Sequence, residues 1–464
     1  MHNIYLKNLL DVYGGILING NVDTELYNFA IDTRTLNKDD IFVGIKGESF
    51  DGSTKYIDAL AKGVKGCILN DTVGINDEII SKYPDTFIIL VDDTIKCLQE
   101  LAKFKRNLYD IPVIGITGSV GKTSTKDMIT SVLKEKYNVL STIGNYNNHI
   151  GVPLTILRLK DENCAVIEMG MNNLGEISVL SKIARPTVSV ITNVGTAHIG
   201  NLGSRENILK AKLEILDGMD DNGVLVINND NDLLHDYYLK NSNNIVTYGI
   251  LNDSNYMARN ILYNSEYSIF NININDIDEE IKVNVPGEAF IYNCLSAISV
   301  GMLFNIDISK IKMGIEKLEL TKRRMEIENI NSINIINDSY NANLDSMNNA
   351  IKYLGSLNGK KIAVIGDMLE LGEYSESIHR SIAHTIISNK IDITITVGNL
   401  SKYIKDELNK NNYNEVFSYD NNDEAFNKLK DIINKGNNIL FKASNSMHFN
   451  DLCNEFVEYV KKYK

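Results

Sequence analysis

The chain has 464 residues, 44% of them hydrophobic, and a formal net charge of −13 at pH 7. That length predicts about three domains, and the acidic balance argues against a nucleic-acid-binding surface. The five cysteines form no Cys-x-x-Cys pair and no apolar stretch could span a bilayer, so we expect a cytoplasmic protein without a disulfide framework, a zinc knuckle or membrane insertion.

Residues 1–106 contain short runs of strand and helix character. Those at 40–45 and 66–70 are examples. Turn residues separate the runs, and none of them is long. We expect a small N-terminal α/β domain.

The most informative segment is the glycine-rich turn at residues 115–125. An apolar run over 111–116 predicts a buried strand before it, and helical spacing over 126–137 predicts a helix after it. Only two residues separate Gly118 from Gly121, where the common phosphate-loop pattern has four. The string alone is therefore weak, but the strand and helix around it favour a phosphate loop over an incidental tight turn.

Such a turn points backbone N–H groups and a helix N-terminus at one place, which makes an anion site. Lys122 can reach the outer phosphates of a nucleotide, and the Thr123 hydroxyl can ligate Mg²⁺. The sequence therefore predicts a loop that holds a nucleoside triphosphate.

Two polar residues follow further predicted strands of this middle segment. Glu168 ends the apolar run 165–167, and His198 follows the run 188–192. The carboxyl ends of parallel strands face the crevice where open α/β sheets bind ligands. Glu168 is either a metal ligand or a cap for the next helix, and a single histidine is more often structural. Their combination with Thr123 favours a metal site.

Two further stretches are polar. Asn145 and Asn148 lie in an asparagine-rich turn, for which a plain surface turn is the simpler interpretation and a substrate-binding loop the alternative. Residues 208–216 form an amphipathic helix whose lysines are ordinarily solvated.

The last third of the chain alternates strand-like and helical runs, as a doubly wound α/β domain does. The predicted strands are 333–336, 361–365, 393–397 and 438–441. We therefore predict an α/β protein with three domains: a small N-terminal domain (1–106), a central parallel-sheet P-loop domain (107–319) and a C-terminal Rossmann-like domain (320–464).

The motifs occur in an order that resembles the Mur ligases over nearly the whole chain. The matching blocks are residues 117–123, 144–153, 167–170, 192–198, 210–214, 337–343 and 366–372. The resemblance implies a monomeric, ATP-dependent acid–D-amino-acid ligase of peptidoglycan synthesis, which forms an amide through an acyl phosphate and releases ADP and phosphate. The blocks 338–343 and 366–372 look most like the branch that uses UDP-N-acetylmuramoyl-tripeptide and D-alanyl-D-alanine.

The resemblance also implies roles for individual residues. Lys212 matches a lysine that the family carries as a carbamate beside Mg²⁺, with Lys210 as the alternative, and Lys122, Glu168, His198 and Lys212 would form the catalytic group. Thr123, Glu168, His198 and Lys212 would serve the metals. The implied ATP-binding positions are Gly118, Ser119, Gly121, Lys122, Thr123, Ser124, Asn293, Arg324 and Asp338. The implied substrate-binding positions are Thr33, Arg34, Asn145, Asn148, Asn341 and Asn343.

Three positions depart from the family pattern: Ala289-Phe290 before Asn293, Ser53 after Asp51-Gly52, and Ala443 where glycine is typical. An alanine in place of glycine restricts positive φ and close backbone approach. Two alternatives stay open: a related amide ligase with another amine acceptor, and a nucleotide-binding protein or plain ATPase on the same scaffold.

Overall fold

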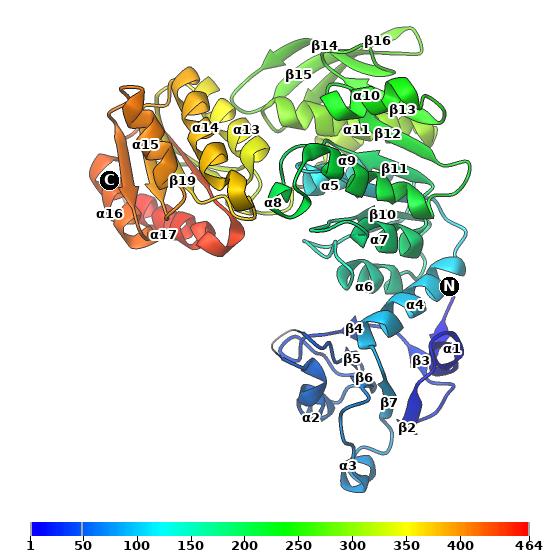
Figure 1. The fold of residues 1–464 in the computed structure, drawn as a ribbon. Coiled ribbons are helices and arrows are strands. Elements are labelled where there is room, and N and C mark those ends of the chain that lie inside the picture. The colour runs from blue at the N-terminus through cyan, green and yellow to red at the C-terminus, as the bar shows by residue number, and fades with distance from the viewer. Residues whose placement is uncertain (1, 48–49, 463–464) are drawn as a thin grey trace.

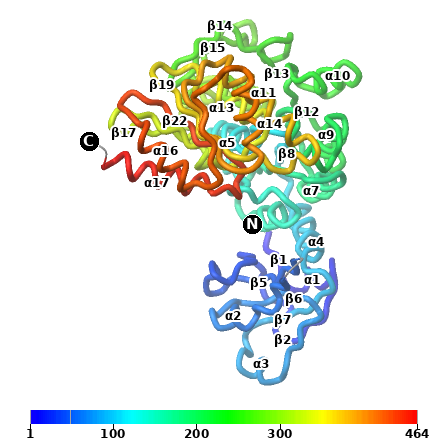
Figure 2. Tube along the Cα trace, turned by 60° about the vertical axis from the view of Figure 1, so that its left-hand side comes forward, coloured from blue at the N-terminus to red at the C-terminus, as the bar shows by residue number. Residues whose placement is uncertain are grey.

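The computed structural model describes residues 2–47 and 50–462 and has three α/β domains, each built on its own sheet (Figure 1). The middle domain, in cyan and green, lies between the other two. The N-terminal domain projects from one end of it, and the C-terminal domain packs beside it. Figure 2 shows the same separation from a second direction, with α13 and α14 of the C-terminal domain over the side of the middle domain that carries α5 and α11.

The N-terminal domain has a five-stranded sheet with the order β2-β7-β6-β5-β4, in which only the β2–β7 pair is antiparallel. The predicted strands at 40–45 and 66–70 are confirmed as β5 and β6. The strands are β1 (Ile4–Tyr5), β2 (Ile16–Asn19), β3 (Glu25–Leu26), β4 (Phe29–Ala30), β5 (Ile41–Val43), β6 (Gly66–Asn70) and β7 (Phe87–Val91). The helices are α1 (Leu6–Val12), α2 (Tyr56–Ala61) and α3 (Asp77–Lys82).

The middle domain has a nine-stranded sheet with the order β16-β15-β14-β13-β12-β11-β8-β10-β9. Strands β8 to β14 pair in parallel, whereas β14, β15 and β16 form an antiparallel extension. The strands are β8 (Val113–Thr117), β9 (Val139–Ser141), β10 (Cys164–Glu168), β11 (Val188–Ile191), β12 (Val224–Asn228), β13 (Ile245–Gly249), β14 (Tyr256–Tyr263), β15 (Ser268–Ile274) and β16 (Ile277–Val283).

Helices cover both faces of the middle sheet, which explains why its central strands are apolar throughout. Every residue of β8, β10 and β11 is buried. One core packs α5, α11 and α12 against the sheet, and another packs α4, α6 and α7. The helices of this domain are α5 (Lys122–Leu133), α6 (Gly151–Leu157), α7 (Glu176–Ala184), α8 (Ile199–Leu202), α9 (Arg205–Leu213), α10 (Asp232–Lys240), α11 (Glu288–Leu303) and α12 (Ile308–Glu316).

Two predicted helices are displaced along the chain. The helix expected at 126–137 begins at Lys122, because Gly121 in the left-handed conformation turns the chain directly into it. The helix expected at 208–216 begins at Arg205, because Ser204 caps it through the Asn207 N–H. Apolar spacing alone could not locate either start.

The C-terminal domain has a six-stranded sheet with the order β17-β18-β22-β19-β20-β21, parallel except for β17. The four predicted strands are confirmed, and two edge strands join them. The strands are β17 (Glu326–Ile330), β18 (Ile333–Asn337), β19 (Lys360–Gly366), β20 (Ile393–Val397), β21 (Val416–Tyr419) and β22 (Asn437–Lys442). The helices are α13 (Leu344–Ser356), α14 (Ser375–Ser388), α15 (Lys402–Lys410), α16 (Asn422–Ile432) and α17 (Phe449–Lys462). Among the described residues, no helix has the length and apolar character needed to cross a membrane.

The helix α4 (Thr94–Asn107) carries the chain from the first domain to the second and ends in a buried arginine. Arg106 Nε donates to the Ala184 carbonyl at 2.7 Å, and Nη1 donates to the Tyr109 carbonyl at 2.6 Å. Its Nη2 donates to the carbonyls of Ile111 and Arg185. The Arg106 guanidinium thus donates hydrogen bonds to backbone carbonyls at the end of α7 and in the segment that precedes β8.

Replacing Arg106 by alanine would leave these four carbonyls without their donor. Because a buried polar group left unsatisfied costs about 1–3 kcal/mol, we expect Arg106→Ala to lower the free energy of unfolding by at least about 2 kcal/mol. Lys103→Ala is the matched control, since Lys103 lies on the same helix and pairs with Glu100 at the surface. Denaturant unfolding measures both, and equal stability of the two variants would contradict the assignment.

Candidate active site

The glycine-rich turn joins β8 to α5 and is packed against the end of β11. A Cβ on Gly118 would lie 1.8 Å from Thr192 Oγ1. Gly121 has a φ of +80° and forms the N-cap of α5. The first glycine is therefore required by close approach and the second by backbone conformation.

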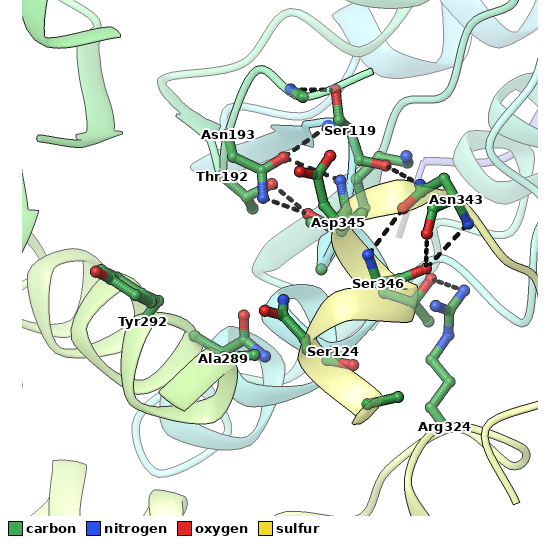
Figure 3. A pocket seen from close by; sticks show the side chains of 18 of the residues that line it. Ser119, Ser124, Thr192, Asn193, Ala289, Tyr292, Arg324, Asn343, Asp345 and Ser346 are labelled. Atoms are coloured by element: carbon green, nitrogen blue, oxygen red, sulfur yellow. Dashed lines mark hydrogen bonds between the residues drawn. The ribbon is translucent and has the colours of Figure 1, made fainter. Parts of the chain in front are cut away.

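The residues after β11 hold the turn in shape (Figure 3). Thr192 Oγ1 donates to the Val120 carbonyl at 2.6 Å, and Asn193 Oδ1 accepts from the N–H groups of Ser119 and Val120 at 3.0 Å each. Ser119 Oγ in turn accepts from the Gly195 N–H. The loop is thus preformed, and the first N–H groups of α5, which have no intrahelical acceptor, remain for an anion.

Lys122 and Thr123 start α5 at the wall of the cavity. Lys122 Nζ donates to the Gly118 carbonyl at 2.7 Å. Burial lowers the pKa of Lys122, and the nearby Glu168 carboxylate opposes that shift. Thr123 Oγ1 accepts from Arg324 Nη2 at 3.0 Å. The guanidinium of a C-terminal-domain residue thus contacts the hydroxyl that is predicted to ligate Mg²⁺.

Glu168 ends β10 and is 1% exposed. Its Oε1 accepts from Asn147 Nδ2 at 2.8 Å, whereas its Oε2 is buried without a hydrogen-bond partner among the described residues. It does not cap the next helix. Glu214 does so instead, since its carboxylate accepts from the N–H groups of Gly175 and Ser178. The capping alternative for Glu168 is therefore excluded.

His198 lies past the end of β11, in the left-handed conformation at a φ of +63°. Its Nδ1 is 2.8 Å from Oε2 of Glu370, which comes from the C-terminal domain. This contact lowers the pKa of Glu370. The sequence motif around Glu370 was recognisable, but its contact with His198 was not.

The two lysines of α9 differ in their surroundings. Lys210 is exposed, whereas Lys212 is 1% exposed. Burial lowers the pKa of Lys212 well below its usual range, and the charge of Lys122 lowers it further. Within residues 2–47 and 50–462, no carboxylate pairs with Lys212. Burial thus shifts Lys212 toward the neutral amine.

Residues at the start of α13 bring the C-terminal domain onto the loop. Asn343 caps α13 through the Ser346 N–H, and its Nδ2 lies 3.5 Å from the Ser119 carbonyl. Asp345 Oδ2 accepts from the Thr196 N–H, and a Cβ on Gly195 would lie 1.9 Å from that oxygen. Figure 3 shows these side chains facing Thr192 and Asn193 across the interface.

The C-terminal domain also contributes a largely buried ion pair to the cavity lining. Lys442 Nζ is 2.5 Å from Asp338 Oδ2 and also donates to the Asn341 carbonyl. The Arg324 guanidinium lies 4.1 Å from the centre of the Tyr340 ring. Lys442 had no predicted role, although it opens the block that contains Ala443.

The helix α11 forms the opposite wall. Asn293 Oδ1 accepts from Thr125 Oγ1 at 2.9 Å, close to Gly121. Ala289 and Tyr292 lie on the same helix and face the cavity (Figure 3), and Phe290 also lines it.

These elements enclose one cavity of about 1060 Å³ between the middle and C-terminal domains. The predicted residues that line it are Ser119, Gly121, Lys122, Thr123, Ser124, Asn145, Glu168, His198, Asn293, Arg324, Asp338, Asn341 and Asn343. The predicted residues outside its lining are Gly118, Asn148, Lys212, Thr33 and Arg34. The cavity combines a phosphate loop, cations from two domains and a buried carboxylate, and so suits transfer of a phosphoryl group.

The residues outside the lining have visible local roles. Asn148 Oδ1 accepts from the N–H groups of Ile150 and Gly151 at the start of α6, as the plain-turn interpretation predicts. Thr33 and Arg34 follow β4 in the N-terminal domain, where Arg34 forms a two-pronged contact with Asp32. The pairing holds the pKa of Asp32 at about 2.

Comparison with known proteins places the chain among one group of enzymes. The Mur ligase middle domain matches residues 116–301, and the Mur ligase glutamate ligase domain matches residues 323–445. The UDP-N-acetylmuramoyl-tripeptide–D-alanyl-D-alanine ligase of Bacillus subtilis is 37% identical over 98% of both chains. The enzyme of that name from Escherichia coli is 33% identical over 87% of this chain and 88% of its own.

Solved structures agree with these matches. A crystal structure of MurF from Acinetobacter baumannii has a TM-score of 0.89 and 27% identity, and the match covers 99% of each chain. MurF of Thermotoga maritima in complex with ADP has a TM-score of 0.82 and 27% identity, covering 94% of this chain and 99% of its own.

The close approach of Gly118 to Thr192 gives a test of the loop. We expect Gly118→Ala to weaken binding of a fluorescent ADP analogue by at least about 10-fold, since an added methyl must displace the loop or β11. Gly74→Ala is the control, because nothing lies within 4 Å of a Cβ there. Equal nucleotide affinity of the two variants would argue against the role of the loop.

Proposed function

The chain belongs to the Mur ligase family, and we propose that it joins UDP-N-acetylmuramoyl-tripeptide to D-alanyl-D-alanine at the expense of ATP. The carrying observation is the single cavity in which Arg324 of the C-terminal domain meets Thr123 of the phosphate loop beside buried Glu168. The products would be the UDP-muramoyl-pentapeptide, ADP and phosphate. Both relatives named above are ligases of this name, and they match 98% and 87% of the chain.

The chemistry explains why the cavity holds several cations. A carboxylate is a poor electrophile, so the tripeptide carboxylate first attacks the γ-phosphate of ATP and ADP leaves. The amine of D-alanyl-D-alanine then attacks the resulting acyl phosphate, and phosphate leaves from a tetrahedral intermediate. Both steps build up negative charge, which Lys122 and Arg324 are placed to stabilise.

Three of the predicted metal-binding residues suit Mg²⁺ in different ways. Thr123 offers a hydroxyl, Glu168 offers a buried oxygen without a partner, and His198 lines the same cavity. The described residues contain no cluster of three or more His, Cys, Asp or Glu side chains that would hold an ion without further ligands. Mg²⁺, when bound, would polarise the phosphates, with nucleotide oxygens completing its ligands.

Lys212 suits the proposed carbamate. Only the neutral amine reacts with CO₂, and burial favours that form of Lys212. The product carries a negative charge, which the neighbouring Lys122 would stabilise. The exposed Lys210 has no such surroundings.

The three domains divide the task in this proposal. Residues 1–106 would bind the uridine nucleotide through Thr33 and Arg34, residues 107–319 would bind ATP, and residues 320–464 would supply Arg324, Asp338, Asn341 and Asn343. Asn145 and Asn148 would lie along the path of the muramoyl peptide, and Ser124 and Asn293 would contact ATP. We expect the reaction to take place in the cytoplasm.

Phosphate release in the presence of each substrate alone and of both together tests the proposed reaction. We expect release only when UDP-N-acetylmuramoyl-tripeptide and D-alanyl-D-alanine are both present, because the acyl phosphate needs the amine to turn over. Release with neither substrate would indicate a plain ATPase. Release with the tripeptide and a different amine, but not with D-alanyl-D-alanine, would indicate a related ligase.

Lys212→Ala tests the carbamate. We expect ligation to fall by at least about 100-fold, without rescue by bicarbonate, because alanine cannot form the carbamate. A ¹³C NMR carbamate signal from ¹³C-bicarbonate should be present in the natural protein and absent from Lys212→Ala. Lys210→Ala is the matched control on the same helix and should keep both signal and activity; near-normal turnover of Lys212→Ala would exclude the assignment.

A further inference from the structure

The two oxygens of the Glu168 carboxylate differ in their contacts. Asn147 Nδ2 donates to Oε1 at 2.8 Å, whereas Oε2 is buried and has no partner among the described residues. The Glu168 side chain is 1% exposed, so bulk water does not compete for either oxygen. A carboxylate held through one oxygen presents the other in a fixed direction.

Asn147 is itself held in place. Its carbonyl accepts from the Gly170 N–H at 2.8 Å, and its own N–H donates to the Asn145 carbonyl at 2.7 Å. A Cβ on Gly170 would lie 2.9 Å from Asn147 Oδ1 and 3.1 Å from Nδ2. The carboxamide therefore lies directly against the backbone of Gly170, two residues beyond Glu168, and only glycine leaves it that space.

Glu168 has a competing partner in Lys122. Both side chains line the same cavity, where the Lys122 ammonium group donates to the Gly118 carbonyl at 2.7 Å. Opposite charges with little water between them attract strongly. If Glu168 turned toward Lys122, it would occupy both the free carboxylate oxygen and the ammonium group that the phosphates need.

We propose that Asn147 is a positioning residue for the ligase reaction. Its carboxamide fixes Oε1 of Glu168, leaves Oε2 as the ligand for a divalent cation, and keeps the carboxylate off Lys122. The inference rests on the proposed function, in which Glu168 holds Mg²⁺, and extends it to a residue that acts through the Glu168 carboxylate.

The test compares Asn147→Ala and Asn147→Leu with the natural protein. Leucine keeps the volume against Gly170 but donates no hydrogen bond. We expect both variants to weaken Mn²⁺ binding, followed by electron paramagnetic resonance with ADP present, by about 10- to 100-fold. We expect kcat to fall by a similar factor while the KM values for the tripeptide and D-alanyl-D-alanine change by less than about threefold.

Asn173→Ala is the matched control. Asn173 Nδ2 also donates to a glutamate, Glu176 Oε1 at 3.0 Å, but this pair is exposed and outside the cavity lining. We expect its Mn²⁺ affinity, kcat and melting temperature to match the natural protein. If the control lost as much Mn²⁺ affinity and kcat as the Asn147 variants, the effect would not be specific to Asn147.

Three results would overturn the proposal. The first is unchanged Mn²⁺ affinity and kcat in both variants. The second is a raised KM for the tripeptide with normal Mn²⁺ binding, which would make Asn147 a substrate-loop residue. The third is a large fall in melting temperature in both variants, which would make it a structural residue. If the natural protein itself showed no substrate-dependent phosphate release, the proposed function would fail first.

Discussion

The site depends on an electrostatic constraint: Lys122, Glu168 and Lys212 lie near one edge of the middle sheet, with Lys122 half-buried and the other two fully buried. Burial lowers the pKa of both lysines, the charge of Lys122 lowers the pKa of Lys212 further, and the charge of Arg324 lowers that of Lys122. A lone carboxylate cannot balance two ammonium groups in such surroundings, so protonation of Lys212 is disfavoured relative to a lysine in water. Neither lysine pairs with Glu168 among the described residues: Lys122 donates to the Gly118 carbonyl, and Lys212 has no carboxylate partner. Oε2 of Glu168 therefore remains available to a ligand.

Parallel pairing is what gathers these groups. Strand β8 lies between β10 and β11 with Ile116 opposite both Glu168 and Val190, so the phosphate loop, Glu168 and the segment before His198 leave the sheet at one level. Thr192 and Asn193, which directly follow β11, hold the short turn through hydrogen bonds to Val120 and Ser119. The two-residue turn between Gly118 and Gly121 is thus braced against the neighbouring strand.

The sequence alone was enough to predict the position of a residue where that position follows from its neighbours along the chain. Strand ends, the phosphate loop and Glu168 at a carboxyl edge are of this kind, since periodicity and turn residues determine them locally. Asn148 shows the limit, because a helix cap and a substrate contact have the same local pattern. Asn147, Glu370 and Lys442 were not assigned roles because their partners lie 21, 172 and 104 residues away. Such contacts depend on how two loops or two domains pack, which no spacing along the chain records.

The three departures from the family pattern differ in whether they line the cavity. Ser53 is buried, and its hydroxyl bridges the Gly44 carbonyl and the Asn70 N–H inside the N-terminal domain. Ala443 is buried with an ordinary φ, and Gly366 leaves room for its methyl group. Neither lines the cavity, whereas Ala289 and Phe290 do, on the wall formed by α11. Of the three departures, only Ala289-Phe290 can therefore contact a ligand in the cavity directly. These two residues lie on α11, close to Asn293, which is proposed to contact ATP. The α13 residues of the C-terminal domain form the opposite wall.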